Sequence, residues 1–339
     1  RLKSARPPAD KSGVRRGFLM MLLTLAVATA ALALPASRAD ARSAGPAVGI
    51  AEQHPTMFAN PAWQRLGLAD TRYLTPWDTL HDPRQLALLD EWMAAARAAH
   101  ARVLIGFGHS LRTQELAHTL PTPGEMEREF RALRARYPWV RDWLAWNEAN
   151  SPGGLTEHRP QRAAQYFDVL ARNCRGCRIV AADVLDVGNI AGWVKRFRRA
   201  AHHAPRIWGL HNYTDANHLR STTTRRFLKV TRGQVWLTET GGVVLRRTYR
   251  GTRVLHTYRY GLKHAATATV QALRLGCLSR RIKRVYLYHW VAPTPVTSWD
   301  SAFVDGSGRM RPAYTALRRW LRTAKASRRG APARTACGR

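Results

Sequence analysis

Short apolar runs rich in β-branched and aromatic residues alternate along the chain with amphipathic stretches of roughly ten to twenty residues. The apolar runs predict eight strands, at 48–52, 71–77, 102–107, 143–146, 178–183, 206–212, 234–239 and 284–290. The amphipathic stretches predict helices at 62–66, 83–100, 123–137, 160–173, 190–201, 257–275 and 312–323, with Pro83 and Pro312 at helix starts. Strands that alternate with helices indicate a parallel sheet with crossover helices.

The strand–helix units fill residues 48–324 and leave no segment for a second domain. Eight units in about 250 residues are typical of a (β/α)₈ barrel, the TIM barrel. The alternative is an open, doubly wound α/β sheet, but no Gly-x-Gly-x-x-Gly follows the first strand. We therefore expect an α/β fold with one barrel at 48–324, a short linker at 42–47 and a basic C-terminal tail at 325–339.

Residues 1–41 have the pattern of a secretory signal peptide with an extended basic n-region. Arg15 and Arg16 precede an uncharged run at 17–37, and Ala39-Asp40-Ala41 supplies a small-x-small cleavage site. The alternative is a retained membrane anchor, because 17–34 is at the lower end of spanning length. The sequence thus predicts an exported protein that is secreted or associated with the cell wall, and membrane-anchored if the signal is not cleaved.

The chain is strongly basic, with 55 Lys and Arg against 22 Asp and Glu and a net charge of +33. The arginines are spread over the predicted helices and form no finger, RNP or helix-turn-helix pattern, so nucleic acid is not an expected partner. Attraction to an anionic cell wall or an acidic polysaccharide fits an exported protein better. The simplest alternative is that these arginines are solvated surface residues without a partner.

Four cysteines, at 174, 177, 277 and 337, allow three pairings, and export favours disulfides. Cys174-x-x-Cys177 has redox spacing, but it follows a predicted helix instead of starting one, which favours a structural link. Cys277 ends the helix before the eighth strand and Cys337 follows the last helix, so we expect these two to pair at the N-terminal face of the barrel. No second Cys or His pair has zinc spacing, and no metal site is predicted.

Two predicted strands end on a glutamate. The run 143–152 places Asn147 and Glu148 after an apolar strand, and the run 234–242 places Glu239 before Gly241 and Gly242. In a barrel the carboxyl ends of the strands meet at one mouth. Glycoside hydrolysis needs two carboxyl groups on either side of one bond, so the sequence predicts that Glu148 and Glu239 form this pair.

Other polar and aromatic residues fall at the same strand ends. They are Glu52, Arg72, Trp77, His109, Asn147, Asp183 or Asp186, His211, Asn212, Tyr213 and Trp290. Each has a structural alternative: His109 as a loop residue, Trp290 as core packing and Arg72 as the partner of a neighbouring carboxylate. Their joint position at one edge favours a site, in which Trp77, Trp146, Trp290 and Trp299 are candidates to stack on sugar rings.

This layout resembles the clan A glycoside hydrolases, especially cellulase-like family 5 and relatives such as family 39. The resemblance implies that Glu148 is the acid/base and Glu239 the nucleophile, and that Asn147 bonds the sugar 2-hydroxyl. It also implies substrate-binding roles for His211 and Tyr213, the latter touching the nucleophile, and for Trp290 beneath the sugar. Arg72 and His109 match the strand-two and strand-three residues of the pattern, although Arg72 comes earlier in its strand.

The sequence therefore predicts a retaining β-glycoside hydrolase that acts by double displacement on a polysaccharide or glycoconjugate, as a monomer without cofactor or metal. The charge of Glu239 is expected to raise the pKa of Glu148 so that it stays protonated. One alternative is a non-catalytic carbohydrate- or cell-wall-binding barrel, and another is a cationic adhesin that uses the barrel as a scaffold.

Overall fold

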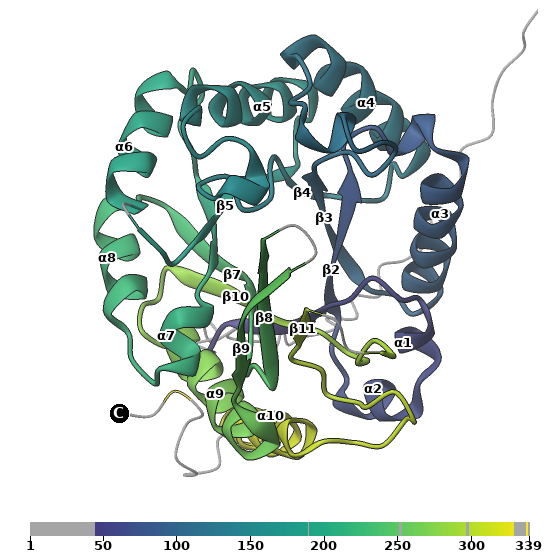
Figure 1. The fold of residues 1–339 in the computed structure, drawn as a ribbon, viewed down its shortest axis with the longest axis vertical. Coiled ribbons are helices and arrows are strands. Elements are labelled where there is room, and N and C mark those ends of the chain that lie inside the picture. Colours follow the sequence, from purple (N-terminus) through teal and green to yellow (C-terminus); the bar gives the residue numbers. More distant parts are fainter. Residues whose placement is uncertain (1–44, 189, 251–252, 296–297, 329–336, 338–339) are drawn as a thin grey trace, which may run out of the picture. The chain divides into compact units, whose positions relative to one another are not determined.

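The computed structural model describes residues 45–188, 190–250, 253–295, 298–328 and 337 (Figure 1). The predicted signal segment 1–41, the first part of the linker 42–47 and most of the tail 325–339 lie outside these residues. Within the described ranges, no helix combines the length and apolar character that crossing a membrane requires.

Eight parallel strands close into a barrel, in the order β1-β10-β7-β6-β5-β4-β3-β2 (Figure 1). The first strand pairs with both the second and the last, which closes the ring. The prediction of a (β/α)₈ barrel is confirmed. The strands are β1 (Ala47–Ala51), β2 (Asp70–Pro76), β3 (Arg102–Gly108), β4 (Asp142–Leu144), β5 (Arg178–Leu185), β6 (Ile207–His211), β7 (Gln234–Thr240) and β10 (Ile282–Tyr288).

Helices surround the barrel, and most begin where the sequence indicated. Proline opens α2, α3, α4 and α5, where its missing N–H removes no intrahelical bond. The side chains of Asn60, Asp82 and Thr122 accept hydrogen bonds from backbone N–H groups in the first turns of α2, α3 and α4. The helices are α1 (Thr56–Ala59), α2 (Pro61–Leu66), α3 (Pro83–Ala98), α4 (Pro123–Arg136), α5 (Pro160–Asn173), α6 (Ile190–Ala200), α7 (Tyr213–Asn217), α8 (Thr222–Val230), α9 (Gly261–Gly276) and α10 (Pro312–Arg328), with 3₁₀ turns at Thr79–His81, Leu116–His118 and Pro152–Gly154.

The core has two parts. A large cluster fills the space between the strands and the helices, and it contains fully buried aromatic side chains such as Trp92, Trp143 and Phe130. A smaller cluster inside the barrel includes Leu104, Leu144, Val180, Trp236 and Tyr286. The interior is therefore a packed core that supports the polar residues at the mouth from below.

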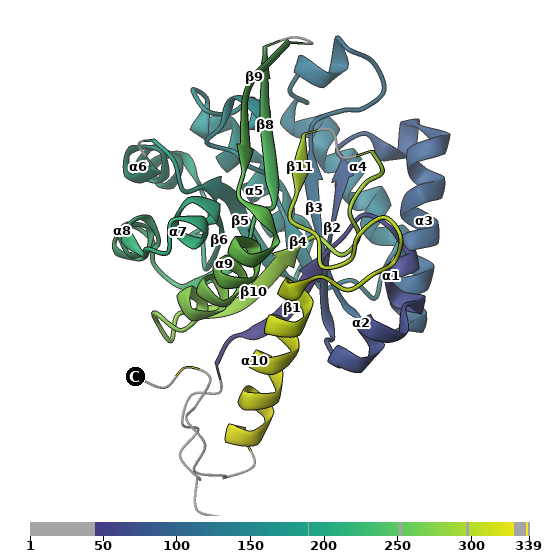
Figure 2. The ribbon, with the colours of Figure 1, turned by 60° about the horizontal axis from the view of Figure 1, so that its bottom comes forward.

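A three-stranded antiparallel sheet was not predicted from the sequence. It has the order β11-β8-β9, with β8 (Leu245–Arg250), β9 (Arg253–Arg259) and β11 (Trp299–Asp300), and its β8–β9 hairpin extends away from the barrel (Figure 2). The prediction of a helix from residue 257 is wrong at its start, because 257–259 belong to β9 and α9 begins at Gly261. Gly261 has φ 82°, a turn between strand and helix that glycine adopts without strain.

Both predicted disulfides are confirmed. Cys174–Cys177 connects the end of α5 to the start of β5, and Cys277–Cys337 connects the end of α9 to the chain beyond α10. The sulfur of Cys337 lies next to Gly45, which comes just before β1. This places the second disulfide at the N-terminal face of the barrel, opposite the strand ends that carry Glu148 and Glu239.

Candidate active site

Glu148 lies just beyond β4 in an unusual backbone conformation. Its φ is 44°, the left-handed region that non-glycine residues rarely adopt. Its carbonyl oxygen accepts two hydrogen bonds from Ser151, from the backbone N–H and the hydroxyl, each 2.9 Å long. Gly154 packs so closely on this carbonyl that any Cβ there would clash with it, and the indole of Trp146 donates to the Gly154 carbonyl at 2.6 Å. Several contacts therefore hold the strained conformation of Glu148 in place.

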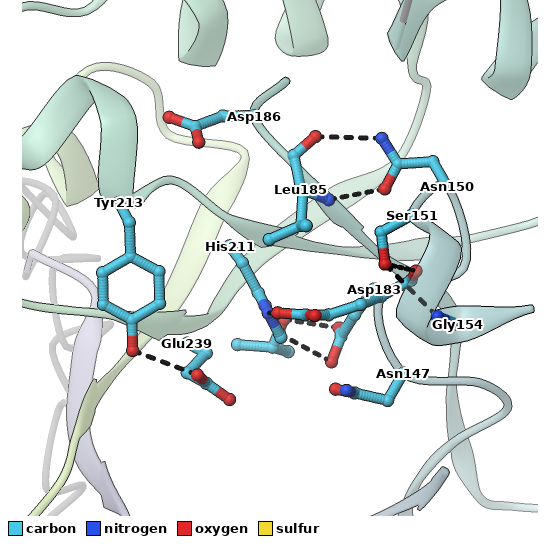
Figure 3. Close-up of polar contacts among 12 residues, drawn as sticks. Asn147, Asn150, Ser151, Gly154, Asp183, Leu185, Asp186, His211, Tyr213 and Glu239 are labelled. Atoms are coloured by element: carbon cyan, nitrogen blue, oxygen red, sulfur yellow. Dashed lines mark hydrogen bonds and ion pairs between the residues drawn. The ribbon is translucent and has the colours of Figure 1, made fainter. Parts of the chain in front are cut away.

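Glu239 is the next-to-last residue of β7 and pairs in register with His211 of β6. Its two carboxylate oxygens have different partners. The Arg72 guanidinium donates to Oε2 at 2.8 Å. The Tyr213 hydroxyl donates to Oε1 at 3.0 Å (Figure 3). The side chain is 15% exposed, so a partly open carboxylate is fixed at the barrel mouth by two donors.

Arg72 connects three strands at the centre of the site. Besides Glu239, it donates to Asn147 Oδ1 at 2.6 Å and to Asp183 Oδ2 at 3.0 Å. Burial alone would lower the pKa of Arg72, but Asp183 and Glu239 raise it, so the guanidinium stays charged. Arg72 is thus the partner of neighbouring carboxylates, which was its structural alternative, and its early position in β2 does not prevent these contacts.

His211 lies between two carboxylates. Its Nδ1 is 3.0 Å from Glu148 Oε1, and its Nε2 is 3.0 Å from Asp183 Oδ2. Burial would lower the pKa of His211, but the charges of Glu239 and Asp183 outweigh burial and raise it to about 10. The imidazole is therefore protonated near neutral pH and donates from both nitrogens.

Asp183 is a fully buried carboxylate beneath the site. Burial raises its pKa, but His211, Arg72 and the Thr238 hydroxyl together hold it below the ordinary value. Gly209 makes the room for it, because a Cβ at this position would collide with the carboxylate. Of the two aspartates considered from the sequence, Asp183 joins the site. Asp186 instead accepts hydrogen bonds from the Thr214 and Asp215 backbone N–H groups in α7.

The expectation of a raised pKa for Glu148 is wrong for this structure. Burial raises the pKa, but the hydrogen bond and positive charge of His211, with the charge of Arg72, lower it further than burial raises it. Repulsion from Glu239 was the basis of that expectation, and the imidazolium of His211 reverses it. In the free protein the proton lies on His211, and Glu148 is the carboxylate that accepts its hydrogen bond.

The two glutamates lie close enough to act on one bond. Ligand atoms of Glu148, His211 and Glu239 all lie within 4.8 Å of one another, so one carboxylate oxygen of each glutamate falls within that distance. The same three residues could hold a metal ion by geometry. A metal would have to displace a proton from His211, whose raised pKa opposes this, so the donor set fits a cation poorly.

Three of the predicted aromatic residues lie in the core. Trp290 is 2% exposed and packs against Phe303 and Tyr314, so it has no open face for a sugar and its predicted stacking role is not supported. Trp146 is fully buried against Tyr166, and Trp77 also belongs to the core cluster. All three indoles lie just past the ends of their strands, β2, β4 and β10, and pack into the core there.

Other predicted residues lie outside the network. His109 is exposed on the loop after β3. The Glu52 carboxylate accepts from the backbone N–H groups of Gln53, His54, Trp290 and Val291, so it ties the end of β1 to the segment after β10. Asn212 is buried and donates to Thr224. Glu52 and Asn212 thus have structural roles.

Tyr288 is a site residue that the sequence argument missed. It is the last residue of β10, and burial together with the charges of Glu239 and Glu52 raises the pKa of its hydroxyl. The sequence did carry a signal for Tyr288. It stands at the true end of the strand, two positions before Trp290. Trp299, which the sequence had offered as a stacking residue, packs edge-to-face on Tyr213 with 4.7 Å between ring centroids.

Comparison with known proteins gives a family match and a fold match. Residues 122–253, which contain both glutamates, match the family described as glycosyl hydrolase catalytic core. No curated protein shows significant similarity to the chain. The match confirms the predicted resemblance to glycoside hydrolases, whereas family 5 and family 39 are not singled out.

Solved structures with the same fold are similar over most of the chain. A GH128 (subgroup I) endo-β-1,3-glucanase from Amycolatopsis mediterranei, in complex with laminaritriose, is 16% identical, with a TM-score of 0.52 and coverage of 81% of this chain and 99% of that one. A β-glucosidase from Thermotoga maritima, in complex with glucoimidazole, is 11% identical, with a TM-score of 0.53 and coverage of 83% and 98%. At such identities the likeness shows the fold alone.

Proposed function

We propose that this chain, a glycoside hydrolase by its catalytic core, cleaves β-glycosidic bonds with retention of configuration. The observation that carries the proposal is the pair of carboxylates at the barrel mouth, with one oxygen of each within 4.8 Å. Retaining enzymes have carboxyl groups about 5 to 5.5 Å apart, whereas inverting enzymes need about 6.5 to 9.5 Å to admit a water. The short separation supports double displacement over inversion.

Glu239 is the proposed nucleophile. One of its oxygens attacks the anomeric carbon and forms a glycosyl ester while the bond to the leaving-group oxygen breaks. The two donors on this carboxylate, Arg72 and Tyr213, hold it in one orientation. Asn147 lies beside it, and its carbonyl oxygen accepts from Arg72. Within the described residues its amide N–H₂ has no acceptor, so it can donate to a sugar hydroxyl.

Glu148 is the proposed acid/base, and His211 supplies its proton. The hydrogen bond between His211 Nδ1 and Glu148 Oε1 lets one proton move between the two groups, and from Glu148 it passes to the leaving-group oxygen. Formation of the ester removes the charge of Glu239, one of the charges that raise the pKa of His211. Glu148 is then a carboxylate beside a neutral imidazole, and it takes a proton from the water that hydrolyses the ester. Hydrolysis also returns the charge of Glu239, which raises the pKa of His211 again, so the proton passes from Glu148 back to His211 and the starting state is restored.

The test is to screen the protein against aryl β-glycosides and β-glycans and to record the anomeric form of the first product by NMR. A first product with the β configuration supports the proposal, and an α product indicates inversion. Absence of turnover on every β-glycoside would favour the alternative of a non-catalytic carbohydrate-binding barrel.

The natural ligand is proposed to be a β-linked glycan outside the cell. The bound laminaritriose of the similar endo-β-1,3-glucanase supports a carbohydrate ligand, and the two disulfides support export, because disulfides persist in oxidising compartments. A pocket of about 640 Å³, lined by Arg131, Arg134, Arg172 and Arg175 among other residues, lies between the C-terminal ends of α4 and α5. Such a cluster supports attraction to an anionic cell-wall polymer.

A further inference from the structure

The β8–β9 hairpin exposes its side chains to an unusual degree. It follows shortly after β7 and therefore starts from the same end of the barrel as Glu239, and it extends away from the barrel (Figure 2). Every residue of β9 is exposed, and Tyr258 keeps 44% of its surface open. Exposed aromatic residues in a soluble protein often mark a binding surface. Nothing in the catalytic network described above uses this hairpin.

The strand register places four side chains of this sheet on one face. Arg246 of β8 pairs with Trp299 of β11 on one side and with Tyr258 of β9 on the other, and directly paired residues point to the same face. His256, opposite Thr248 and two positions from Tyr258, shares that face. We call Trp299, Arg246, Tyr258 and His256 the aromatic row.

Ring and cation contacts connect neighbouring members of the aromatic row. The Arg246 guanidinium carbon is 6.0 Å from the centroid of the Trp299 ring, within the range of a cation–π contact. The rings of Tyr258 and His256 have centroids 6.1 Å apart. Arg246 forms no ion pair with any carboxylate in the described part of the chain, so its donors are available to a ligand.

The aromatic row begins beside the nucleophile. Trp299 packs edge-to-face on Tyr213, and the Tyr213 hydroxyl donates to Glu239. From Trp299 to Tyr258 the row crosses two strand spacings, which is roughly 10 Å and about the length of two linked hexoses. A glycan that reaches Glu239 can therefore continue along this face of the sheet.

We infer that the aromatic row binds the sugar units of a polysaccharide beyond the one that is cleaved, so that the preferred substrate is an extended chain. The inference rests on the proposed glycosidase function and specifies its substrate class. The aromatic rings of Trp299 and Tyr258 offer flat apolar surfaces to the C–H faces of sugars. Arg246, between them, donates to sugar hydroxyl or carboxylate oxygens.

The test compares chain lengths. The values of kcat/KM are measured for disaccharides and hexasaccharides of the laminari, cello and manno series, and for 4-nitrophenyl β-glycosides as reference substrates. The proteins compared are wild type, Tyr258→Ser, Tyr258→Phe and Arg246→Gln. Arg259→Gln is the charge-matched control, since Arg259 neighbours Tyr258 in β9 and therefore lies on the opposite face of the hairpin.

In wild type the hexasaccharide is expected to be the better substrate in at least one series. Tyr258→Ser should lower the ratio of hexasaccharide to disaccharide kcat/KM by about tenfold, with the loss in KM, because it removes a stacking surface. Tyr258→Phe should keep the ratio, Arg246→Gln should lower it, and Arg259→Gln should leave it as in wild type.

Two results would overturn the inference. One is a wild type that hydrolyses 4-nitrophenyl glycosides but shows no preference for longer chains. The other is a ratio that stays the same in Tyr258→Ser, or falls equally in Arg259→Gln. In both cases the proposed glycosidase function still holds, whereas it fails if no β-glycoside is hydrolysed at all. Because β9 is exposed along its whole length, Tyr258→Ser should leave the thermal unfolding of the barrel unchanged, and this is checked first.

Discussion

Glu148 Oε1 and His211 Nδ1 lie 3.0 Å apart, and this contact decides which group of the site carries the proton. His211 also touches Asp183, so the imidazole is surrounded by negative charge and binds its proton tightly. Burial alone would favour the protonated form of Glu148, but the hydrogen bond and charge of His211 keep it a carboxylate. The acid of this site is a two-residue unit, and its properties cannot be assigned to Glu148 alone.

The two glutamates should respond differently to replacement. Glu239→Ala removes the nucleophile and should lower turnover of all substrates by at least about a thousandfold. Glu148→Ala should still form the glycosyl ester from aryl glycosides whose leaving groups need no proton, and the ester should then accumulate. Azide should rescue Glu148→Ala with a product of retained configuration and Glu239→Ala with an inverted one. The reverse pattern would exchange the two assignments.

His211 should make the stability of the protein depend on pH in alkaline solution. Its pKa is about 10 in the folded protein and about 6.5 in an unfolded chain. Because the folded state binds this proton more tightly, the stabilisation is complete below pH about 6.5 and is lost as the pH rises to about 10. Urea unfolding of wild type and His211→Gln across this range should show the difference between them shrinking. A constant difference would contradict the charged imidazole.

Gly154 should be required for the position of Glu148. A Cβ at Gly154 would clash with the Glu148 carbonyl, so Gly154→Ala should destabilise the fold by about 1 to 3 kcal/mol and lower kcat. Gly153→Ala is the matched control, because a Cβ there would lie 3.8 Å from the Ser151 hydroxyl, an ordinary contact. The free energy of unfolding and kcat are measured for both variants. Equal losses in Gly154→Ala and Gly153→Ala would argue against the tight turn at Gly154.

The two disulfides should stabilise to different extents. Cys277–Cys337 closes a loop with a sequence separation of 60, and Cys174–Cys177 closes one of only 3. In the chain-entropy model these loops correspond to about 4 and about 2 kcal/mol. Replacing Cys277 and Cys337 by serine should therefore lower the free energy of unfolding more than replacing Cys174 and Cys177. The opposite order would show that native-state contacts outweigh loop closure.

Much of the barrel could be predicted from the sequence because its signals are local. Alternation of apolar and amphipathic runs marks the strands and helices, and prolines such as Pro83 and Pro123 mark helix starts. The closed parallel order follows from this alternation and from the right-handed crossovers that parallel strands require. The β9 strand was missed because all its residues are exposed, so it lacks the alternation that marks a half-buried strand.

For the site, the sequence determined which residues come to the barrel mouth, since parallel strands deliver Glu148, Asp183, His211 and Glu239 to one end. It did not determine how they are paired, because side chains from β2, β5, β6 and β7 meet only after the ring closes. The same holds for Trp290. Its position near a strand end could be predicted from the sequence, but its burial against Phe303 and Tyr314 could not. The protonation of His211 and Glu148 was likewise set by the tertiary structure, because a pKa depends on burial and on charges brought close by distant parts of the chain.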